Sequence, residues 1–411
     1  MNQTLRAGDI DPSFGSGGYV NVTELLGVSA LRPDQKIVTV ATLWEGIGVQ
    51  VYRNLPDGTP DPLFGADGKL IPFPHTGVSF YNVTGCALQS DGKIIVFGHL
   101  HGPGNSRKIL LARLHEAGEV DTSFGNAGYT LVRLEDTSTD EAQSVAVLPD
   151  DRIVMSVWGD IQSGIGYGAL VQLAADGTFD PSFGKVGISL DVPPQVHFLS
   201  ISPQRDGTLL LCGYAGGDSR TMQPVASRYD RGGKPLPSFG DNGHRFFDYL
   251  EAYPGTSFWQ ALSLMTLSDG KLLMAGLVAP PVRNATTWLT RLQADGATDM
   301  AFNDGKLVIT TTGYMEDKLI LQADGKIVMQ GEVVAGTQSV IERRMPDGSR
   351  DPTFGDGGFV FIDSPADSFI SSGASAMLQT DGKLLLCLRV GKTDIGAPEG
   401  FVGMLLTRYL L

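Results

Sequence analysis

Two histidines one residue apart, His99 and His101, are candidates for metal chemistry. On an extended segment the side chains of residues i and i+2 lie on one face, so both imidazoles can bind one zinc or copper ion. His75 and His197 are expected at the same end of the fold. Solvated loop histidines are a commoner cause of such a pattern. We therefore expect no obligatory cofactor, and a divalent metal at His99 and His101 is a hypothesis.

Three carboxylates close together, Asp136, Asp140 and Glu141, offer a second kind of chemistry. They could chelate calcium or act as paired acid and base groups. A solvated acidic loop explains the same residues. The GxSxG and HExxH motifs of hydrolases and a Cys/His pairing do not occur. The catalytic residues therefore remain unknown from the sequence.

Aromatic side chains in segments of variable sequence form the third candidate surface. Indole and phenol rings beside carboxylates and amides suit sugars and peptides, although such residues are also ordinary in loops. Together with the two histidines, the candidate ligand-binding residues are Trp44, Tyr81, His99, His101, Trp158, Tyr214, Tyr253 and Trp259.

A repeated motif indicates which elements must position these residues. The stretch DPSFGSGG at residues 11–18 recurs about every 59 residues. Its other copies are DPLFGADG from 61, DTSFGNAG from 121, DPSFGKVG from 180, LPSFGDNG from 236, DMAFNDG from 299 and DPTFGDGG from 351. Two further motifs alternate with it, exemplified by LQSDGKIIVF from 88 and RLQADG from 291.

Each repeat contains short apolar runs rich in β-branched residues and separated by turn residues, which predicts four strands. Asp-Gly between two such runs is typical of a hairpin. Seven four-stranded antiparallel units predict an all-β, seven-bladed β-propeller. We expect a single domain over residues 1–411, with blades at 29–77, 78–135, 136–193, 194–250, 251–311, 312–364 and 365–411 plus 1–25.

The two chain ends predict how the last blade is completed. The chain finishes in LLTRYLL, a third strand with no DPSFG after it, and begins with a DPSFG that has no third strand before it. We expect three C-terminal strands and one N-terminal strand to form one blade. This pairing closes the ring and removes a free sheet edge.

The alternation of LQxDGK, RLxxDG and SFGxxG resembles the delta-60 repeat family of bacterial repeats, and it covers nearly all 411 residues. The resemblance implies a propeller, often within secreted or cell-envelope proteins. It carries no reaction and no catalytic residues. Two copies depart from the pattern, LPSFG and DMAFN, and we expect looser turns there.

The repeated motif itself could be a calcium loop, a phosphate cradle or a structural turn. The acidic positions vary among the copies, and the glycines lead into strands rather than a helix, so the first two explanations are weak. An Asp that caps backbone amides, a Phe that packs between blades and glycines with positive φ explain the pattern better.

Blade topology separates a uniform face from a variable one. The turns between strands 1 and 2 and between strands 3 and 4 lie on one face and are nearly identical in every repeat. The other loops vary and lie on the opposite face, which is the usual binding face of a repeat protein. We call it the variable-loop face.

Composition narrows the partners. The formal charge is −14, which argues against nucleic acid, and no apolar run is long enough to span a membrane. The three cysteines lie in apolar runs and are expected to be free thiols. No signal peptide is visible at the N-terminus, although the resemblance favours a secreted or cell-envelope location.

The favoured function is a non-enzymatic module that binds a carbohydrate, peptide or protein partner through the variable-loop face. The alternative is a propeller-type hydrolase or lyase with a histidine and carboxylate site, with or without a metal. A third interpretation is a scaffold within a larger assembly.

Overall fold

The computed structural model describes most of the chain. The described residues are 5–23, 27–42, 49–70, 82–101, 107–134, 137, 139–160, 166–185, 187–190, 192–193, 195–216, 222–249, 258–279, 286–310, 314–333, 338–363, 368–392 and 401–411. They contain no helix with the length and apolar character needed to cross a bilayer.

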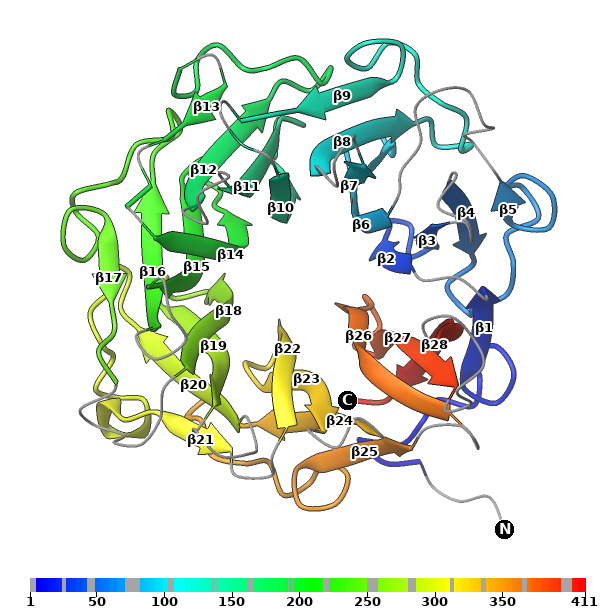
Figure 1. The fold of residues 1–411 in the computed structure, drawn as a ribbon. Helices are drawn as coiled ribbons and strands as arrows, with labels where there is room; N and C mark the ends of the chain where they lie inside the picture. Colours follow the sequence, from blue (N-terminus) through cyan, green and yellow to red (C-terminus); the bar gives the residue numbers. More distant parts are fainter. Residues whose placement is uncertain are drawn as a thin grey trace. The chain divides into compact units, whose positions relative to one another are not determined.

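The fold is all-β, and its strands form seven four-stranded antiparallel sheets, which confirms the predicted seven-bladed β-propeller (Figure 1). Within six sheets the strands follow one another in chain order. The second and third strands of the blades are largely apolar and buried on both faces, as in Ile153–Asp160 with five buried residues in a row, because successive residues point to opposite faces of a sheet that is covered on both sides. We number the blades from 1 to 7 in the order of their first strands.

Blades 2 to 5 contain β6 (Asn82–Leu88), β7 (Ile94–His101), β8 (Arg107–Leu114), β9 (Tyr129–Val132), β10 (Thr139–Val147), β11 (Ile153–Asp160), β12 (Gly166–Leu173), β13 (Ile188–Ser189), β14 (Val196–Pro203), β15 (Leu209–Ala215), β16 (Gln223–Tyr229), β17 (His244–Phe246), β18 (Phe258–Thr266), β19 (Leu272–Ala279), β20 (Thr286–Leu292), the 3₁₀ turn η2 (Asn303–Gly305) and β21 (Val308–Thr310).

Blades 1, 6 and 7 contain β2 (Gly27–Leu31), β3 (Ile37–Thr42), β4 (Val49–Asn54), β5 (Lys69–Leu70), β22 (Tyr314–Leu321), β23 (Ile327–Val333), β24 (Gln338–Arg344), β25 (Phe359–Asp363), β26 (Ser368–Leu378), β27 (Leu384–Lys392), β28 (Phe401–Tyr409) and β1 (Tyr19–Thr23).

The chain divides into two compact units, which we describe separately. Unit 1 comprises Met1–Cys86, Ala117–Glu119 and Thr312–Leu411, and unit 2 comprises Ala87–Glu116 and Val120–Thr311. Unit 1 therefore contains blades 1, 6 and 7. Unit 2 contains blades 3, 4 and 5 and strands β7 to β9 of blade 2.

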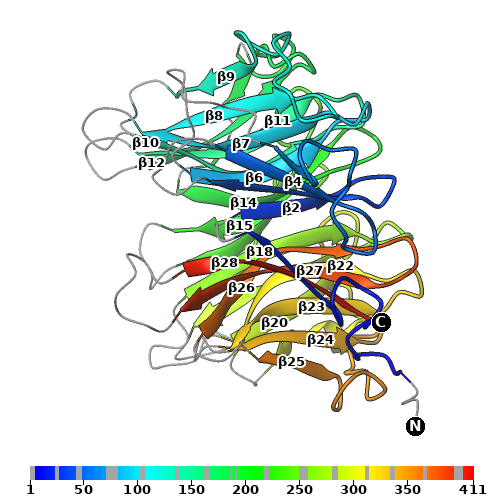
Figure 2. The same ribbon diagram turned by 90° about the vertical axis from the view of Figure 1, so that its right-hand side faces the viewer.

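In unit 1 the seventh blade combines both ends of the chain, as predicted. Strand β1 pairs antiparallel with β28, with Tyr19 opposite Thr407 and Val20 opposite Leu406. The segment before β1 continues the contact, because the amide of Gly8 donates to the carbonyl of Leu410 at 2.9 Å. Figure 2 shows β1 beside β28 in this unit.

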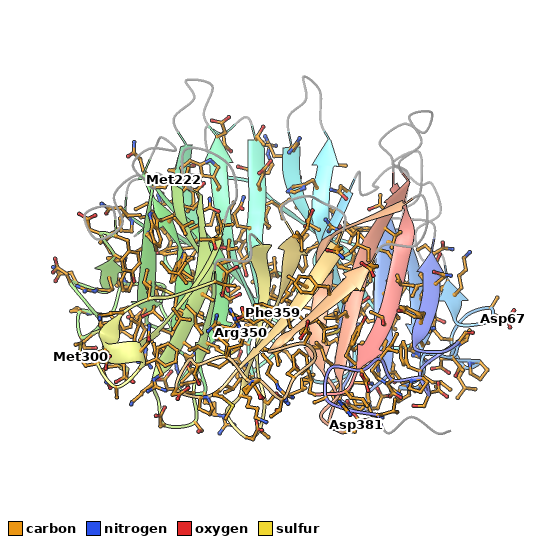
Figure 3. All side chains as sticks on the ribbon, turned by 90° about the horizontal axis from the view of Figure 1, so that it is seen from below. Asp67, Met222, Met300, Arg350, Phe359 and Asp381 are labelled. Atoms are coloured by element: carbon orange, nitrogen blue, oxygen red, sulfur yellow. The ribbon has the colours of Figure 1, made fainter. Side chains whose placement is uncertain are left out.

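In unit 2 the ends of the strands define two sides of each blade. We call the side with the first-to-second and third-to-fourth strand turns the turn end, and the opposite side the loop end. Met300, in the motif of blade 5, lies at the turn end, and Met222, just before β16, lies at the loop end (Figure 3). The loop end corresponds to the variable-loop face.

Apolar side chains from neighbouring sheets form the core of unit 2. Between blades 3 and 4 one cluster contains Val154, Leu170, Val196 and Leu211, all fully buried, together with Phe183 of the repeated motif. Burial of each such side chain contributes about 1.5–3 kcal/mol. The apolar faces of successive sheets thus pack against each other and hold adjacent blades together.

The repeated motif forms a structural clasp, best described at blade 2. Asp121 accepts hydrogen bonds at Oδ1 from the amide and hydroxyl of Ser123, as a turn-capping Asp should. Its Oδ2 accepts from Nε of Arg113, on the third strand, at 2.8 Å. Lys93, of the first turn, lies 3.5 Å from the same oxygen. All three sequence motifs of one blade therefore meet at one carboxylate.

The clasp of blade 2 also holds blade 3. Nη1 of Arg113 donates to the carbonyl of Ala175 at 2.5 Å, and the Phe124 ring lies 4.9 Å below the guanidinium. Phe124 is fully buried against Gly177, which has a φ of +84°. Only glycine leaves room for the ring at this turn. The predicted role of the Phe between blades is confirmed.

Five clasps share the arginine and aspartate ion pair. The Nε–Oδ2 or Nη2–Oδ2 distances are 2.6–2.9 Å in Arg53–Asp61, Arg113–Asp121, Arg291–Asp299, Arg343–Asp351 and Arg408–Asp11.

Blade 4 lacks the motif Asp, yet its turn keeps the backbone geometry of the other copies. The amide of Leu236 donates to Arg228 at 2.8 Å, and the amide of Phe239 donates to Leu236 at 3.0 Å. The guanidinium of Arg228 instead bonds Asp206 at 2.9 Å. The expectation of a looser turn is therefore wrong here, because the backbone bonds do not need the carboxylate.

Blade 5 departs in a different way. Its motif keeps Asp299, which bonds Arg291, but Asn303 stands where the other copies have Gly. Asn303 and Asp304 adopt φ values of 46° and 55° in a short 3₁₀ turn. Phe302 remains buried. The turn has a different shape, while its ion pair and its buried ring are unchanged.

Candidate functional site

Three rings from two blades of unit 2 form a stack at the loop end. The His197 ring, on β14, lies 3.4 Å from Trp158 on β11 and 4.6 Å from Tyr214 on β15, measured between ring centroids. The interplanar angles are 24° and 10°. All three residues are half-buried. The stack joins blade 3 to blade 4 at the loop end, where ligand binding was expected.

Strand register explains why these residues meet. His197 and Tyr214 are directly opposite on β14 and β15, so their side chains project from one face of blade 4. On blade 3, Trp158 is opposite Glu141 of β10. The carboxylate of Glu141 and the indole of Trp158 therefore project from the same face of blade 3.

Two glycines of β12 make room for this arrangement. A side chain at Gly166 would collide with the indole of Trp158, so the missing Cβ lets the ring lie over β12. A Cβ at Gly168 would lie 2.7 Å from the carbonyl oxygen of Val196 on β14. Gly168 thus allows blade 4 to approach blade 3 closely.

Both first strands carry a β-bulge next to the site. The register shifts between Ala142 and Ser144 on β10 and between Phe198 and Ser200 on β14. A bulge bends its strand and changes the direction of the side chains beyond it. Glu141 and His197 lie on the loop-end side of these shifts, so the bulges set where both side chains point.

A surface ion pair includes Glu141, the register partner of Trp158. Nη1 of Arg107, the first residue of β8, donates to Oε1 of Glu141 at 2.7 Å. The side chains are 48% and 32% exposed, so solvent and ligands can reach both partners. A second pair is buried: Nζ of Lys108 lies 2.9 Å from Oδ2 of Asp140, whose side chain is fully buried.

The buried pair assigns a role to part of the acidic cluster. Asp140 accepts from Lys108 and from the hydroxyl of Thr137, so its oxygens are engaged within the fold. A buried carboxylate paired in this way supports the contact between blades 2 and 3 and is not open to a ligand. Glu141 is the accessible member, and Asp136 lies outside the described residues.

The ring stack carries no charge near neutral pH. Burial lowers the pKa of His197 from 6.5 to about 4, so the imidazole is neutral there. Burial also raises the pKa of the Tyr214 hydroxyl. Within the described part of the chain, no hydrogen bond engages the indole N–H, the imidazole nitrogens or the phenol.

The structure thus brings together two of the eight predicted ligand-binding residues, Trp158 and Tyr214. It places Trp259 in the core of blade 5, 1% exposed and 6.2 Å from the Trp288 ring, so that indole is not loop surface. The other aromatic candidates lie outside the described residues; they are Trp44, Tyr81 and Tyr253.

The histidine pair stays a prediction. His99 is half-buried on β7, opposite Ile109 of β8, and the side chain of His101 lies outside the described residues, as does His75. Among the residues that the structure describes, no three His, Cys, Asp or Glu side chains are grouped as metal ligands. The three cysteines are free, as expected.

His197 was missing from the predicted ligand-binding set, and so was Arg107. The sequence did contain a signal for the ring stack: the GYG stretch at 166–168 begins β12 with two residues that lack a side chain, which leaves room for a large neighbour such as Trp158. No local pattern connects Arg107 with Glu141, because the two residues belong to different blades.

Comparison with protein families gives one match. The model described as "Domain of unknown function (DUF5122) beta-propeller" matches residues 89–124, 148–183 and 322–354. Each matched segment runs from the first turn of a blade to the motif Phe. No curated protein matches the chain.

Solved structures resemble the chain at low sequence identity. The polysaccharide lyase Uly1 is 12% identical, with a TM-score of 0.57, over 100% of this chain and 94% of the lyase. The Nup133 β-propeller domain of Vanderwaltozyma polyspora is 11% identical, with a TM-score of 0.47, over 95% and 97%. The aldose sugar dehydrogenase of Streptomyces coelicolor is 13% identical, with a TM-score of 0.42, over 84% and 96%. By family model and by structure, the chain is therefore similar to β-propellers.

Proposed function

We propose that this chain is a non-enzymatic binding module that recognises its partner at the loop end of blades 3 and 4. The partner is a carbohydrate, a peptide or a protein. The observation that carries this proposal is the stack of Trp158, His197 and Tyr214, contributed by two blades and half-exposed. Rigid aromatic side chains with free polar edges supply contact area at low entropic cost.

The packing around the stack supports a site that exists before any partner arrives. Gly166, Gly168 and the two bulges fix the positions of the rings. A preorganised surface loses little conformational entropy on binding, and more of the contact energy appears as affinity. The motif at the turn end is fully used in holding blades together, which leaves the loop end for recognition.

Binding arrays test the proposal directly. Glycan and peptide arrays are probed with the full chain and with Trp158→Ala and Tyr214→Ala. Loss of a ring that supplies about 1.5–3 kcal/mol lowers affinity roughly 10- to 100-fold. Leu63→Ser, which changes a side chain 81% exposed in the repeated motif of blade 1, serves as the control and should bind like the wild type. Ligands retained equally by both ring variants would refute the proposal.

A second candidate is a lyase or hydrolase. It is favoured by the neutral imidazole of His197 beside the Tyr214 hydroxyl, two groups that can move a proton, with Glu141 on the adjacent blade face. The polysaccharide lyase likeness in fold is compatible with it. Incubation of polysaccharides with the full chain, followed by chromatography of the products, separates the candidates: shortened chains support the enzyme, and intact chains support the binding module.

A further inference from the structure

We infer that the loop-end site, defined as Arg107, Glu141, Trp158, His197 and Tyr214, binds an uncharged oligosaccharide. This inference rests on the proposed function and names its ligand class. It is carried by three properties of the site: ring edges without a hydrogen-bond partner among the described residues, an exposed donor and acceptor pair, and charges that balance within the described part of the site.

The rings match the mixed surface of a sugar. A pyranose presents C–H groups beside hydroxyls, and aromatic rings with a polar edge contact both kinds of group. The indole N–H and the phenol supply donors, and the neutral imidazole supplies one donor and one acceptor. None of these atoms has a hydrogen-bond partner among the described residues.

The Arg107–Glu141 pair extends the polar part of the site. The guanidinium has only donors and the carboxylate only acceptors, and their bond is 2.7 Å long. Adjacent sugar hydroxyls both donate and accept, so two of them can bond to this pair without breaking it. Because Glu141 is opposite Trp158 in the strand register, such hydroxyls would lie next to the ring stack.

The paired charges of the site favour an uncharged sugar over a charged one. Glu141 balances Arg107, Asp140 balances Lys108, and His197 is neutral at physiological pH. A uronate or sulfate would have to compete with Glu141 for Arg107 and would meet the field of a chain with a formal charge of −14. A cationic amino sugar would have to compete with Arg107 for Glu141. An uncharged chain leaves both pairs intact.

Titration of matched oligosaccharides tests the inference on the full chain. The probes are cello-, manno- and xylo-oligosaccharides, oligogalacturonates and chitosan oligomers of equal length. We expect at least one uncharged series to bind, with oligogalacturonates and chitosan oligomers about tenfold weaker or worse, and with affinity insensitive to salt. Arg107→Gln and Glu141→Gln should each weaken binding about tenfold, while Leu63→Ser should not change it.

Two failures are distinguishable. Tighter binding of oligogalacturonates or chitosan oligomers that still depends on Trp158 and Tyr214 overturns the uncharged class and keeps the binding module. Binding of peptides alone through the same rings has the same consequence. If no oligosaccharide binds, the inference fails. If neither the arrays nor the titration shows binding that depends on Trp158 and Tyr214, the proposed function fails with it.

Discussion

Nε of Arg113 donates to Oδ2 of Asp121 across 2.8 Å, with both side chains almost fully buried. The two residues stand eight positions apart, at the end of a third strand and in the turn that follows it. This pair joins the hairpin to the next blade, because the same guanidinium also bonds the carbonyl of Ala175. It is the central contact of a clasp that most blades repeat.

We expect the arginine of a clasp to contribute more to the free energy of unfolding in blades that keep the motif Asp than in the blade that lacks it. Arg113→Met leaves Asp121 buried without its main partner and should lower the free energy of unfolding by about 3–5 kcal/mol. Arg228→Met in blade 4 is the natural control, because Leu236 replaces the Asp there and Arg228 pairs with an exposed carboxylate. We expect a loss of about 1 kcal/mol or less from that variant. Urea unfolding measures both, and equal losses would contradict the assigned role of the pair.

Acid should weaken the clasp. Burial alone would raise the pKa of Asp121, but hydrogen bonds from Ser123 and the charge of Arg113 outweigh it and lower the pKa from 3.8 to about 2. The folded pKa is below the unfolded one, so the stabilisation is complete above about pH 4 and is lost as pH falls through 2. The loss is about 2 kcal/mol for one such residue. Unfolding between pH 6 and pH 2 should show a flatter pH dependence in Asp121→Asn, and an unchanged slope would disprove this linkage.

Replacing a glycine can destabilise the fold through a clash of the new Cβ atom or through an unfavourable backbone conformation, and two glycines separate these two costs. Gly177 and Gly270 both have a φ of +84°, but a Cβ at Gly177 would lie 2.5 Å from the Phe124 ring, whereas Gly270 has open space around it. Gly270→Ala should cost about 1 kcal/mol from the backbone alone. Gly177→Ala should cost about 1–3 kcal/mol more, because the ring must move. Thermal unfolding compares them, and similar melting temperatures would show that Phe124 does not rest on this glycine.

Asp151 has a left-handed backbone conformation that is unfavourable for a residue with a side chain, and we expect its contact with the preceding blade to offset that cost. Asp151 has a φ of 65°, and its carboxylate accepts from the amide and hydroxyl of Ser90, both at 2.6 Å. Asp151→Gly relieves the backbone but loses these bonds, so its net effect on stability should be within about 1 kcal/mol. A double-mutant cycle with Ser90→Ala should give a coupling of about 0.5–1.5 kcal/mol between the two side chains. Additive effects would rule out the link.

The sequence predicted the blades because their pattern is local and repeated. The spacing of the motif and the alternating apolar runs were sufficient for seven four-stranded sheets and for the pairing of β1 with β28. The Asp of the motif was expected to cap its turn, as it does. Its ion pair with the third-strand arginine was not foreseen, because single-sequence patterns describe turns better than contacts between the motifs of one blade.

The candidate site was harder to predict for a physical reason. Whether a loop-end aromatic meets a partner depends on strand register, bulges and missing Cβ atoms on another blade, as with Trp158 over Gly166. Trp259 shows the opposite case, in which a residue expected at the surface is buried in the core. It was assigned to a loop, yet β18 begins one residue earlier, and alternation along the strand turns its indole into the core.

The motif Phe of one blade packs on a glycine of the following blade, as Phe124 packs on Gly177. This contact affects how the number of repeats in such a chain can change during evolution. Among the described residues, five motif rings lie against a glycine of the following blade in this way, so most repeats carry a ring for the next blade and a glycine that receives the ring of the preceding one. A duplicated or deleted repeat would therefore find compatible neighbours on both sides without a new interface. The number of repeats can therefore change while the loop ends vary independently of the clasps.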